Sequence, residues 1–555
     1  MKRWLIALLI VVAACGALMV AVGLVLRSAI RGAEKDKLIA SLGEKVGVPI
    51  SVATVDLDLS EWFHFRPAVA LGNVTIGNPP GFHAKDLVDA KTISAQVSLL
   101  PLFHKRVEVQ SIIVDQPRIV VETNNKGLTN VEAFLKKLSA SGGGGHAGTG
   151  GATSVAIGQF SVTSGTLTYS GGENVSLHDI DLLVSGFSTD RPCHINLSAK
   201  YAPGSVSGFK VEGEAGPFTP DSLPVNATLS LTIAPSEIPA ALRREQFGVM
   251  LASPGDKSRA SLEATIKGDA YGTFAGPAKL TLSRVMIGGH QDHLLPLSGE
   301  APSHFTAASL MSSPQFQLDI PNAKLQLGKG QWTGSADFKL RGKVMAGGTR
   351  GAIREIDINE FLSSFTSSSG KVYGLLAMPS STLRFSGHNA AETLNSLKGT
   401  AKISITQGRI AALDLPATLE RVFGHPESTA ASKGSTNFST LSANVNIADR
   451  QMNVSDLALE SPVLRVTGSG VIGFDESINF ALVAHVSGGR LGQVISTGPL
   501  HMPNVNADIP LTVTGTVQSP QVRPQIGKIA KEAVHETVRG IVGQILKKKL
   551  QQPPQ

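Results

Sequence analysis

Apolar and polar side chains alternate one by one along most of this chain. In residues 225–233, Val, Ala, Leu, Leu and Ile occupy every second position and are separated by Asn, Thr, Ser and Thr. The same period of two marks residues 195–201, 262–266 and 336–340, and it recurs over about 350 residues. Successive side chains of a β-strand point to opposite faces, so each segment predicts a strand with one apolar and one polar face. The chain is therefore predicted to be mainly β, with antiparallel strands.

Signals for helices are few. Residues 28–46 mix apolar and charged side chains in the pattern of a short amphipathic helix. Residues 389–397 and 416–423 predict two more short helices, the second with a proline at its start. From Ile526 onward, apolar residues recur at spacings of three and four and end at three consecutive lysines, 547–549. The tail is therefore predicted to be an amphipathic helix with cations at its C-terminal end.

So many strands with one apolar face need something to cover that face, and the predicted helices are too few to do it. Either the sheet closes into a sandwich or barrel, or it curls around an apolar ligand. Aromatic residues make up only 5% of the chain, and the aliphatic side chains that dominate suit flexible acyl chains. About 30 strands at the usual spacing would form a rod of the order of 150 Å. The residues predicted to contact acyl chains are Leu229, Leu231, Leu325, Leu327, Phe480 and Leu482.

The N-terminus holds an uncharged segment long enough to cross a membrane. It runs from Trp4 to Leu26 and would span roughly 34 Å as a helix, against about 30 Å for a bilayer core. Lys2 and Arg3 before it favour a cytoplasmic N-terminus. We expect a single uncleaved membrane anchor in residues 1–27, with the bulk of the chain outside the cytoplasm.

Two other interpretations of this segment remain open. Residues 12–15 match a bacterial lipobox, which would make Cys15 a lipidated N-terminus, although the apolar run continues beyond it. Ordinary signal-peptide cleavage would need a small-residue site, and residues 24–27 supply a poor one. The second cysteine is Cys193, and an intramolecular disulfide between the two is not expected.

The motifs of common enzyme classes are missing from the sequence. It contains no P-loop, GxSxG elbow, HExxH or paired CxxC motif. Residues 468–473 match G-x-G-x-x-G, but strand spacing continues after them, so we interpret the glycines as part of a strand turn. His290, Asp292 and His293 are interpreted as a solvated turn. We expect a protein without catalytic residues, cofactor or metal.

The charge pattern gives little reason to expect a nucleic-acid partner. The formal net charge is +7 for 50 basic and 43 acidic residues, and basic residues are scattered except at 547–549. Aromatic residues do not alternate with them, as they would in a nucleic-acid-binding surface. The basic, amphipathic tail could instead lie on an anionic membrane, dock on a partner or cap the end of the sheet.

Two groups of short motifs resemble the AsmA family of bacterial envelope proteins. The N-terminal group is 67–82 (PAVALGNVTIGNPPGF), 99–103 (LLPLF), 114–119 (VDQPRI) and 124–130 (NNKGLTN). The C-terminal group is 394–399 (LNSLKG), 408–410 (GRI), 413–415 (LDL) and 466–470 (VTGSG). Together with an N-terminal anchor, their order makes the resemblance fairly specific.

This resemblance implies an inner-membrane anchor and a periplasmic body built as an elongated, curved antiparallel β-sheet that forms a groove. Related proteins, similar to the chorein-type bridge-like lipid transfer proteins, are implicated in moving phospholipid toward the outer membrane and in outer-membrane integrity. On this basis we expect an anchor in 1–27, an N-terminal AsmA-like region in 28–138, a glycine-rich linker in 139–154, a middle β region in 155–350, a C-terminal AsmA-like region in 351–520, and an amphipathic helix and tail in 521–555.

The expected function is therefore a lipid conduit whose partners are membrane phospholipids and components of both membranes. A second hypothesis is a periplasmic scaffold or assembly factor for outer-membrane proteins, with closed cores and no lipid transport. A third is an anchored enzyme or glycan-binding protein, which the missing motifs disfavour. The hypotheses differ most clearly in whether the apolar face is open or closed.

Overall fold

The computed structural model describes residues 39–40, 43–44 and 47–525, with gaps at 59–65, 99–106, 125–127, 135–154, 171–173, 188–190, 218–221, 238–256, 270–271, 291–292, 309–314, 343, 367–368, 412, 425–433 and 488–505. The predicted anchor from Trp4 to Leu26, Cys15, the whole glycine-rich linker 139–154 and the tail from Ile526 lie outside the described residues. Within the described part, no helix is both long and apolar enough to cross a membrane. Residues 39–40 and 43–44 of the predicted 28–46 helix are helical.

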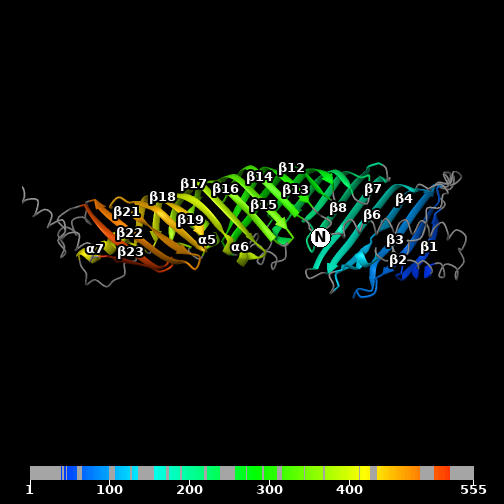
Figure 1. Cartoon of the computed structure of the whole chain (residues 1–555), viewed down its shortest axis with the longest axis horizontal. Helices are drawn as coiled ribbons and strands as arrows, with labels where there is room; N and C mark the ends of the chain where they lie inside the picture. The colour runs from blue at the N-terminus through cyan, green and yellow to red at the C-terminus, as the bar shows by residue number, and fades with distance from the viewer. Residues whose placement is uncertain are drawn as a thin grey trace, which may run out of the picture.

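The described residues form one very long, twisted sheet (Figure 1). Its 24 strands are fewer than the 30 expected from the sequence, because many of them are longer than ten residues. The strands are β1 Ile50–Asp58, β2 Ala68–Gly77, β3 Asp86–Ser98, β4 Val107–Asp115, β5 Arg118–Glu122, β6 Val155–Ser170, β7 Asn174–Phe187, β8 Cys193–Ala202, β9 Gly208–Ala215, β10 Pro224–Ile233, β11 Arg259–Asp269, β12 Thr273–His290, β13 His293–Ala308, β14 Gln315–Leu327, β15 Gly330–Arg341, β16 Val344–Asp357, β17 Val372–Gly387, β18 Lys398–Ala411, β19 Ser435–Ala448, β20 Gln451–Glu460, β21 Leu464–Gly473, β22 Ser477–Ser487, β23 Asn506–Thr516 and β24 Pro520–Pro524.

From β6 to β24, each strand pairs antiparallel with the next strand in the chain, as alternation in the sequence predicts. The N-terminal part is different, because β4 and β5 both pair parallel to β6. The connection from β5 to β6 contains the glycine-rich segment 139–154. That segment does not divide the sheet, since the strands on either side of it are direct neighbours. The sheet also continues unbroken through position 350 within β16, and position 521 lies within β24.

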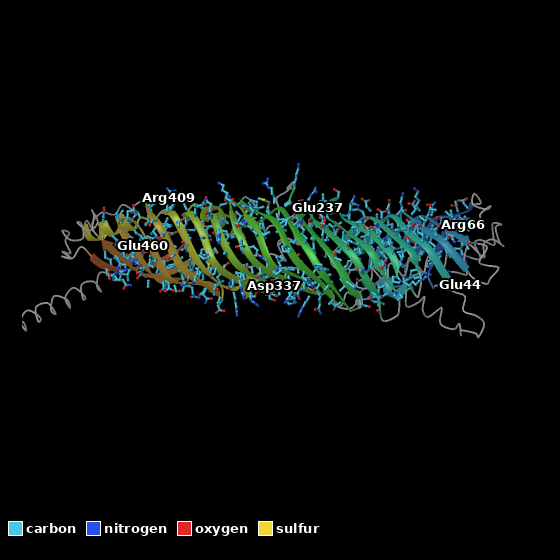
Figure 2. The ribbon with its side chains drawn as sticks, turned by 90° about the horizontal axis from the view of Figure 1, so that it is seen from above. Glu44, Arg66, Glu237, Asp337, Arg409 and Glu460 are labelled. Atoms are coloured by element: carbon cyan, nitrogen blue, oxygen red, sulfur yellow. The ribbon has the colours of Figure 1, made fainter. Side chains whose placement is uncertain are left out.

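One face of this sheet is apolar along its whole length. Residues paired across neighbouring strands lie on the same face, so the register can be followed from strand to strand. Leu231 pairs with Leu262, and Leu262 pairs with Leu280. Toward the C-terminus, Val466 pairs with Ala484, which pairs with Ile509. Charged side chains lie along the full length of the molecule, from Glu44 and Arg66 to Arg409 and Glu460 (Figure 2).

β-Bulges keep the apolar residues on this face where the sequence spacing changes. From Leu282 to Val285, strand β12 advances by three residues while its partner β13 advances by only two. Arg284, within this bulge, takes a φ of +49°. A one-residue slip would otherwise turn every later apolar side chain of β12 to the polar face. A similar shift separates Ile353 and Ile356 in β16, with Glu355 at a φ of +55°.

The buried core consists of two large clusters at the ends and three small ones between them. The N-terminal cluster draws on β1–β8, and the C-terminal cluster lies on β12–β23 and the helices described next. The central clusters contain two to five buried residues each, and most of those are alanines. The middle of the sheet therefore has a smaller hydrophobic core than its ends.

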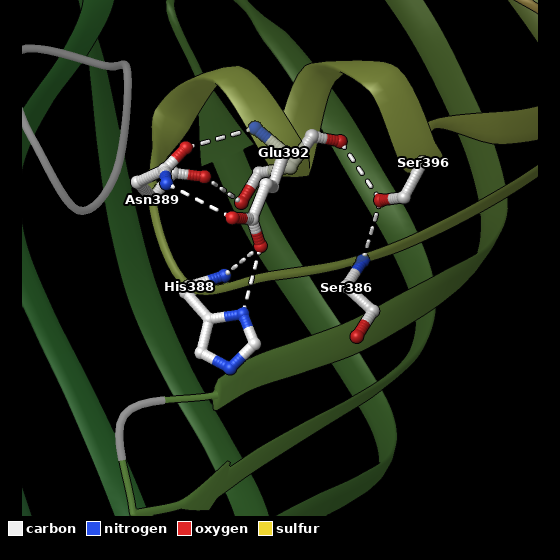
Figure 3. A network of polar contacts seen from close by, with 6 residues as sticks. Ser386, His388, Asn389, Glu392 and Ser396 are labelled. Carbon is white, nitrogen blue, oxygen red and sulfur yellow. Dashed lines mark hydrogen bonds and ion pairs between the residues drawn. The ribbon is translucent and has the colours of Figure 1, made fainter.

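Three α-helices whose full bounds are described lie between the strands: α5 Ile358–Phe365, α6 Ala390–Ser396 and α7 Leu415–Gly424. Predictions of helices at 389–397 and 416–423 are confirmed by α6 and α7. Asn389 caps α6, because its Oδ1 accepts from the Glu392 backbone N–H at 2.9 Å (Figure 3). The Glu392 carboxylate in turn accepts hydrogen bonds from the His388 backbone N–H and from its ring (Figure 3). At the other end of the helix, the Ser396 Oγ accepts from the Ser386 N–H (Figure 3). Helix α5 was not predicted from the sequence.

The apolar face as candidate functional site

All six predicted contact residues lie on the apolar face, at three separate places along it. Leu229 and Leu231 lie in β10 and are half-buried, and so are Phe480 and Leu482 in β22. Leu325 and Leu327 in β14 are each 7% exposed. Leu325 packs in a central cluster, whereas Leu327 and Leu482 belong to the C-terminal one. The structure thus places these residues along one surface and does not gather them into one pocket.

Gly468 and Gly470 of the G-x-G-x-x-G match lie inside strand β21 and not in the expected strand turn, and Gly473 ends the strand. The side chains above the first two leave no room for a larger residue. Phe480 covers Gly470, where an added Cβ would lie 2.4 Å from the ring. Leu482 covers Gly468, whose φ is +157°. Gly408 is covered by Phe438 in the same way. The glycines give the aromatic and leucine side chains room to lie flat on the apolar face.

The sheet curls toward its apolar face. Helix α5 has eight residues and is about 12 Å long, yet it packs against both β12 and β17. Those strands would lie roughly 24 Å apart on a flat sheet. Helix α7 likewise packs against β19 and β24. Since Ile358 of α5 and Leu419 of α7 are buried among apolar-face residues, both helices lie on the inner side of the curl.

The C-terminal end of the sheet is rolled up and filled by its own residues. Leu415 and Leu419 of α7 are almost fully buried against the apolar face. Asp414 caps this helix by accepting from the Ala417 N–H at 2.9 Å. Lys371, before β17, donates from Nζ to the carbonyl of Gln518, between β23 and β24, at 3.4 Å. Strands far apart in the sheet order therefore meet here.

The N-terminal end is covered by a short helical segment, residues 130–134. Val131 and Phe134 are each 2% exposed and pack in the N-terminal cluster. Asn130 anchors the segment: its Oδ1 accepts from the Glu122 and Val131 N–H groups, and its Nδ2 donates to the Asn78 Oδ1 and the Val120 carbonyl. Asn78 and Asn130 come from two of the motifs that carry the family resemblance, and the structure shows them in contact.

Polar chemistry is confined to the other face and to the loops. Ion pairs such as Lys279–Glu300 at 2.8 Å are exposed. Thr467, His485 and Asp508 form a hydrogen-bonded line on the polar face, with Thr467 Oγ1 3.2 Å from His485 Nε2. They come from three adjacent strands on an open surface, and we interpret them as a cross-strand contact. No group of three His, Cys, Asp or Glu side chains in the described ranges is arranged to hold a metal ion.

One carboxylate ties two loops together at an edge of the sheet. Glu237, which ends the 3₁₀-helix Pro235–Glu237, accepts from the backbone N–H groups of Ser205, Val206 and Ser207 at 2.6–3.0 Å. Burial alone would raise the pKa of this carboxyl, but the backbone and hydroxyl donors outweigh it and lower the pKa to about 2. Residues 205–207 lie in the loop between β8 and β9, and Glu237 lies in the loop after β10. Glu237 therefore holds these two loops together at the edge beside the central strands.

Because the folded pKa of Glu237 is depressed, its stabilisation is present above about pH 4.5 and is lost as the pH falls toward about 2. We expect Glu237→Gln to speed amide exchange at residues 205–207 about tenfold at pH 7. The same comparison near pH 2 should show little difference between the variant and the parent. The exposed Glu263, replaced by Gln, is the control and should leave these amides unchanged. Amide exchange is measured by hydrogen exchange with mass spectrometry. Equal exchange rates in the variant and the parent at pH 7 would show that the Glu237 carboxylate does not hold residues 205–207.

A comparison with protein families identifies the N-terminal part of the chain. Residues 2–213 match the family model described as the AsmA family. Over these residues the chain is similar to the AsmA family. The match runs from the predicted anchor into β9 and includes Asn78, Glu122 and Asn130. It ends before the C-terminal AsmA-like motifs, so the resemblance at 394–470 stays a prediction. Searches of curated proteins and of solved structures found no match.

Proposed function

We propose that this protein, whose N-terminal region is similar to the AsmA family, carries phospholipid along its apolar face, between the inner membrane and the outer membrane. The observation that carries the proposal is a single apolar face that continues through all 24 described strands and keeps half-buried side chains such as Leu229, Leu231 and Phe316 in the middle. Monomeric soluble proteins rarely leave so much contiguous apolar surface without a partner. A ligand that covers such a surface must itself be long and apolar.

The chemistry of the face favours acyl chains over a protein partner. Its central side chains are mainly Val, Leu, Ala and Phe, with no charged group among the paired apolar-face residues of β9–β12. The polar face and the loops carry the charges, so a phospholipid could keep its head group in water while its chains contact the sheet. The similarity of residues 2–213 to the AsmA family supports the same location, with an anchor in the inner membrane and the sheet in the periplasm.

The proposed movement of lipid along the sheet involves no chemical reaction. Lipids would move along a surface of similar side chains, so that each step exchanges one set of apolar contacts for an equivalent one. The sheet, at about 4.8 Å per strand, extends roughly 110 Å. A rod of that length, tethered at one end, would reach across much of a periplasm. In this proposal no described residue acts as an acid, a base or a nucleophile.

Native mass spectrometry of the chain purified from a bacterial envelope without detergent tests this function. We expect several phospholipids to remain bound per chain, with a mixture of head groups. A lipid-free, monodisperse protein would contradict the conduit and favour the scaffold for outer-membrane proteins.

A further inference from the structure

Cations on the polar face of the sheet have acidic neighbours in several strands. In the middle of the sheet, the Lys279 Nζ lies 2.8 Å from a carboxylate oxygen of Glu300. Toward the C-terminus, the Arg465 Nε lies 3.0 Å from a carboxylate oxygen of Glu460. Opposite charges on neighbouring strands neutralise each other at these places, as is common for cross-strand pairs. One part of the polar face departs from this arrangement.

The polar face of β16, β17 and β18 holds four exposed cations without acidic partners. They are called the basic patch and are Arg350, Arg384, Lys398 and Lys402. Arg384 pairs with Lys398, and Arg350 pairs with Thr382, so the first three share a face. Lys402 lies on the same face because it follows Lys398 in β18 by an even number of residues. In the part of the chain that the structure describes, none of the four side chains forms an ion pair or a hydrogen bond.

Two cations of the basic patch lie directly opposite each other. Arg384 and Lys398 are partners in the register, so their Cβ atoms lie about 5 Å apart, and like charges in this position destabilise a sheet. The rows of paired residues that contain the patch hold no aspartate or glutamate between β16 and β19. In the row of Arg384 the next acidic residue is Asp337 in β15, which is separated from it by Gly348. The sheet therefore keeps a positive charge here that an external anion would neutralise.

The surface between these cations consists of small polar side chains. Thr382 and Thr400 lie at its centre, with their hydroxyl oxygens 2.9 Å apart. Ser380, Asn444 and Asn446 continue the same rows, which contain no aromatic or large aliphatic residue from β16 to β19. Such residues anchor most protein–protein interfaces and insert into membrane surfaces. Hydroxyl and amide groups instead suit a hydrated partner that carries hydroxyl groups of its own.

We propose that the basic patch binds a carboxylate-bearing polysaccharide on the polar face of the sheet. The guanidinium and ammonium groups pair with the carboxylates, and the threonine and asparagine side chains bond to sugar hydroxyls. Arg350 lies about 8 Å from Arg384, and Lys402 about 14 Å from Lys398, measured between Cα atoms. This spacing fits several carboxylates of one polymer chain better than a single small anion. The site lies on the opposite face to the proposed lipid path and does not depend on lipid transport.

Binding of polygalacturonate, a polysaccharide with one carboxylate on every sugar, to the full-length chain in detergent micelles tests this site. Biolayer interferometry gives the dissociation constant. The double variant Arg384→Gln, Lys398→Gln should bind at least fivefold more weakly, and its urea midpoint should be no lower, because the two cations repel each other. The matched control is Lys210→Gln, Lys279→Gln, which removes the same charge from exposed ion pairs outside the patch and should weaken binding less than twofold.

Three outcomes would overturn the site. Equal weakening in the two double variants would show that binding follows net charge and not the patch. Unaltered binding in the patch variant, or no binding of polygalacturonate to the parent chain, would show that these cations hold no such polymer. Poly-glutamate of matched length carries carboxylates without hydroxyls and should bind at least fivefold more weakly than polygalacturonate. Equal binding of the two polymers would replace the polysaccharide with an acidic polypeptide.

Discussion

Replacing Leu229 with Asp is expected to remove most of the phospholipid bound to the middle of the sheet. Leu229 is half-buried on the apolar face of β10, among Ala227, Ala264 and Phe316. An ionised carboxylate facing acyl chains costs several kcal/mol, so lipid occupancy of this stretch should fall at least tenfold. The number of lipids per chain, measured by native mass spectrometry on detergent-free protein, reports the loss.

The matched control for this change is one residue away. Thr228 is exposed and points to the polar face of the same strand, so Thr228→Asp introduces the same charge on the opposite side. It should keep the lipid load of the unaltered protein. If both variants retain equal amounts of lipid while remaining folded by circular dichroism, the apolar face is not the lipid-binding surface.

Replacing Asn130 with Leu is expected to give the largest loss of stability among single substitutions at the N-terminal end. Asn130 is completely buried, and its side chain makes four hydrogen bonds, including those to Asn78 and Glu122. Leucine has a similar size but leaves the Glu122 N–H and the Val120 carbonyl without their partner. Two or more unsatisfied buried groups correspond to a destabilisation of about 3 kcal/mol.

Urea denaturation measures this effect, with hydrogen exchange at residues 118–134 to locate it. The exposed Asn446, replaced by Leu, serves as the control and should change the free energy of unfolding by less than about 0.5 kcal/mol. An Asn130→Leu protein as stable as the control would show that the segment 130–134 is not held by this side chain.

Alternation in the sequence predicted the fold class well, because a period of two has few physical explanations. It also placed Leu229, Leu325 and Leu482 on the apolar face of their strands, and the register shows that this is one common face. Alternation alone could not show which residues of different strands share a face of the sheet, because bulges such as that at Arg284 shift the period within a strand. Only the paired register resolves it.

The covers of the apolar face could not be predicted in the same way. Helix α5 was missed because its apolar residues, Ile358, Phe361 and Leu362, follow directly on the strand residues Ile353 and Ile356, so the change of period is short. The Asn78–Asn130 contact joins residues 52 positions apart, which the spacing of motifs does not show. Parallel pairing of β5 with β6 depends on a long connection that composition predicts only as a linker.

The central claim is that lipid lies on one face of the sheet, and photo-crosslinking at four consecutive positions tests it most directly. Residues 228–231 of β10 alternate between the polar face and the apolar face. With a photo-reactive side chain at each position in turn, lipid adducts should form at Leu229 and Leu231 and be at least fivefold weaker at Thr228 and Ser230. Equal labelling at all four positions, or none at any, would contradict the account.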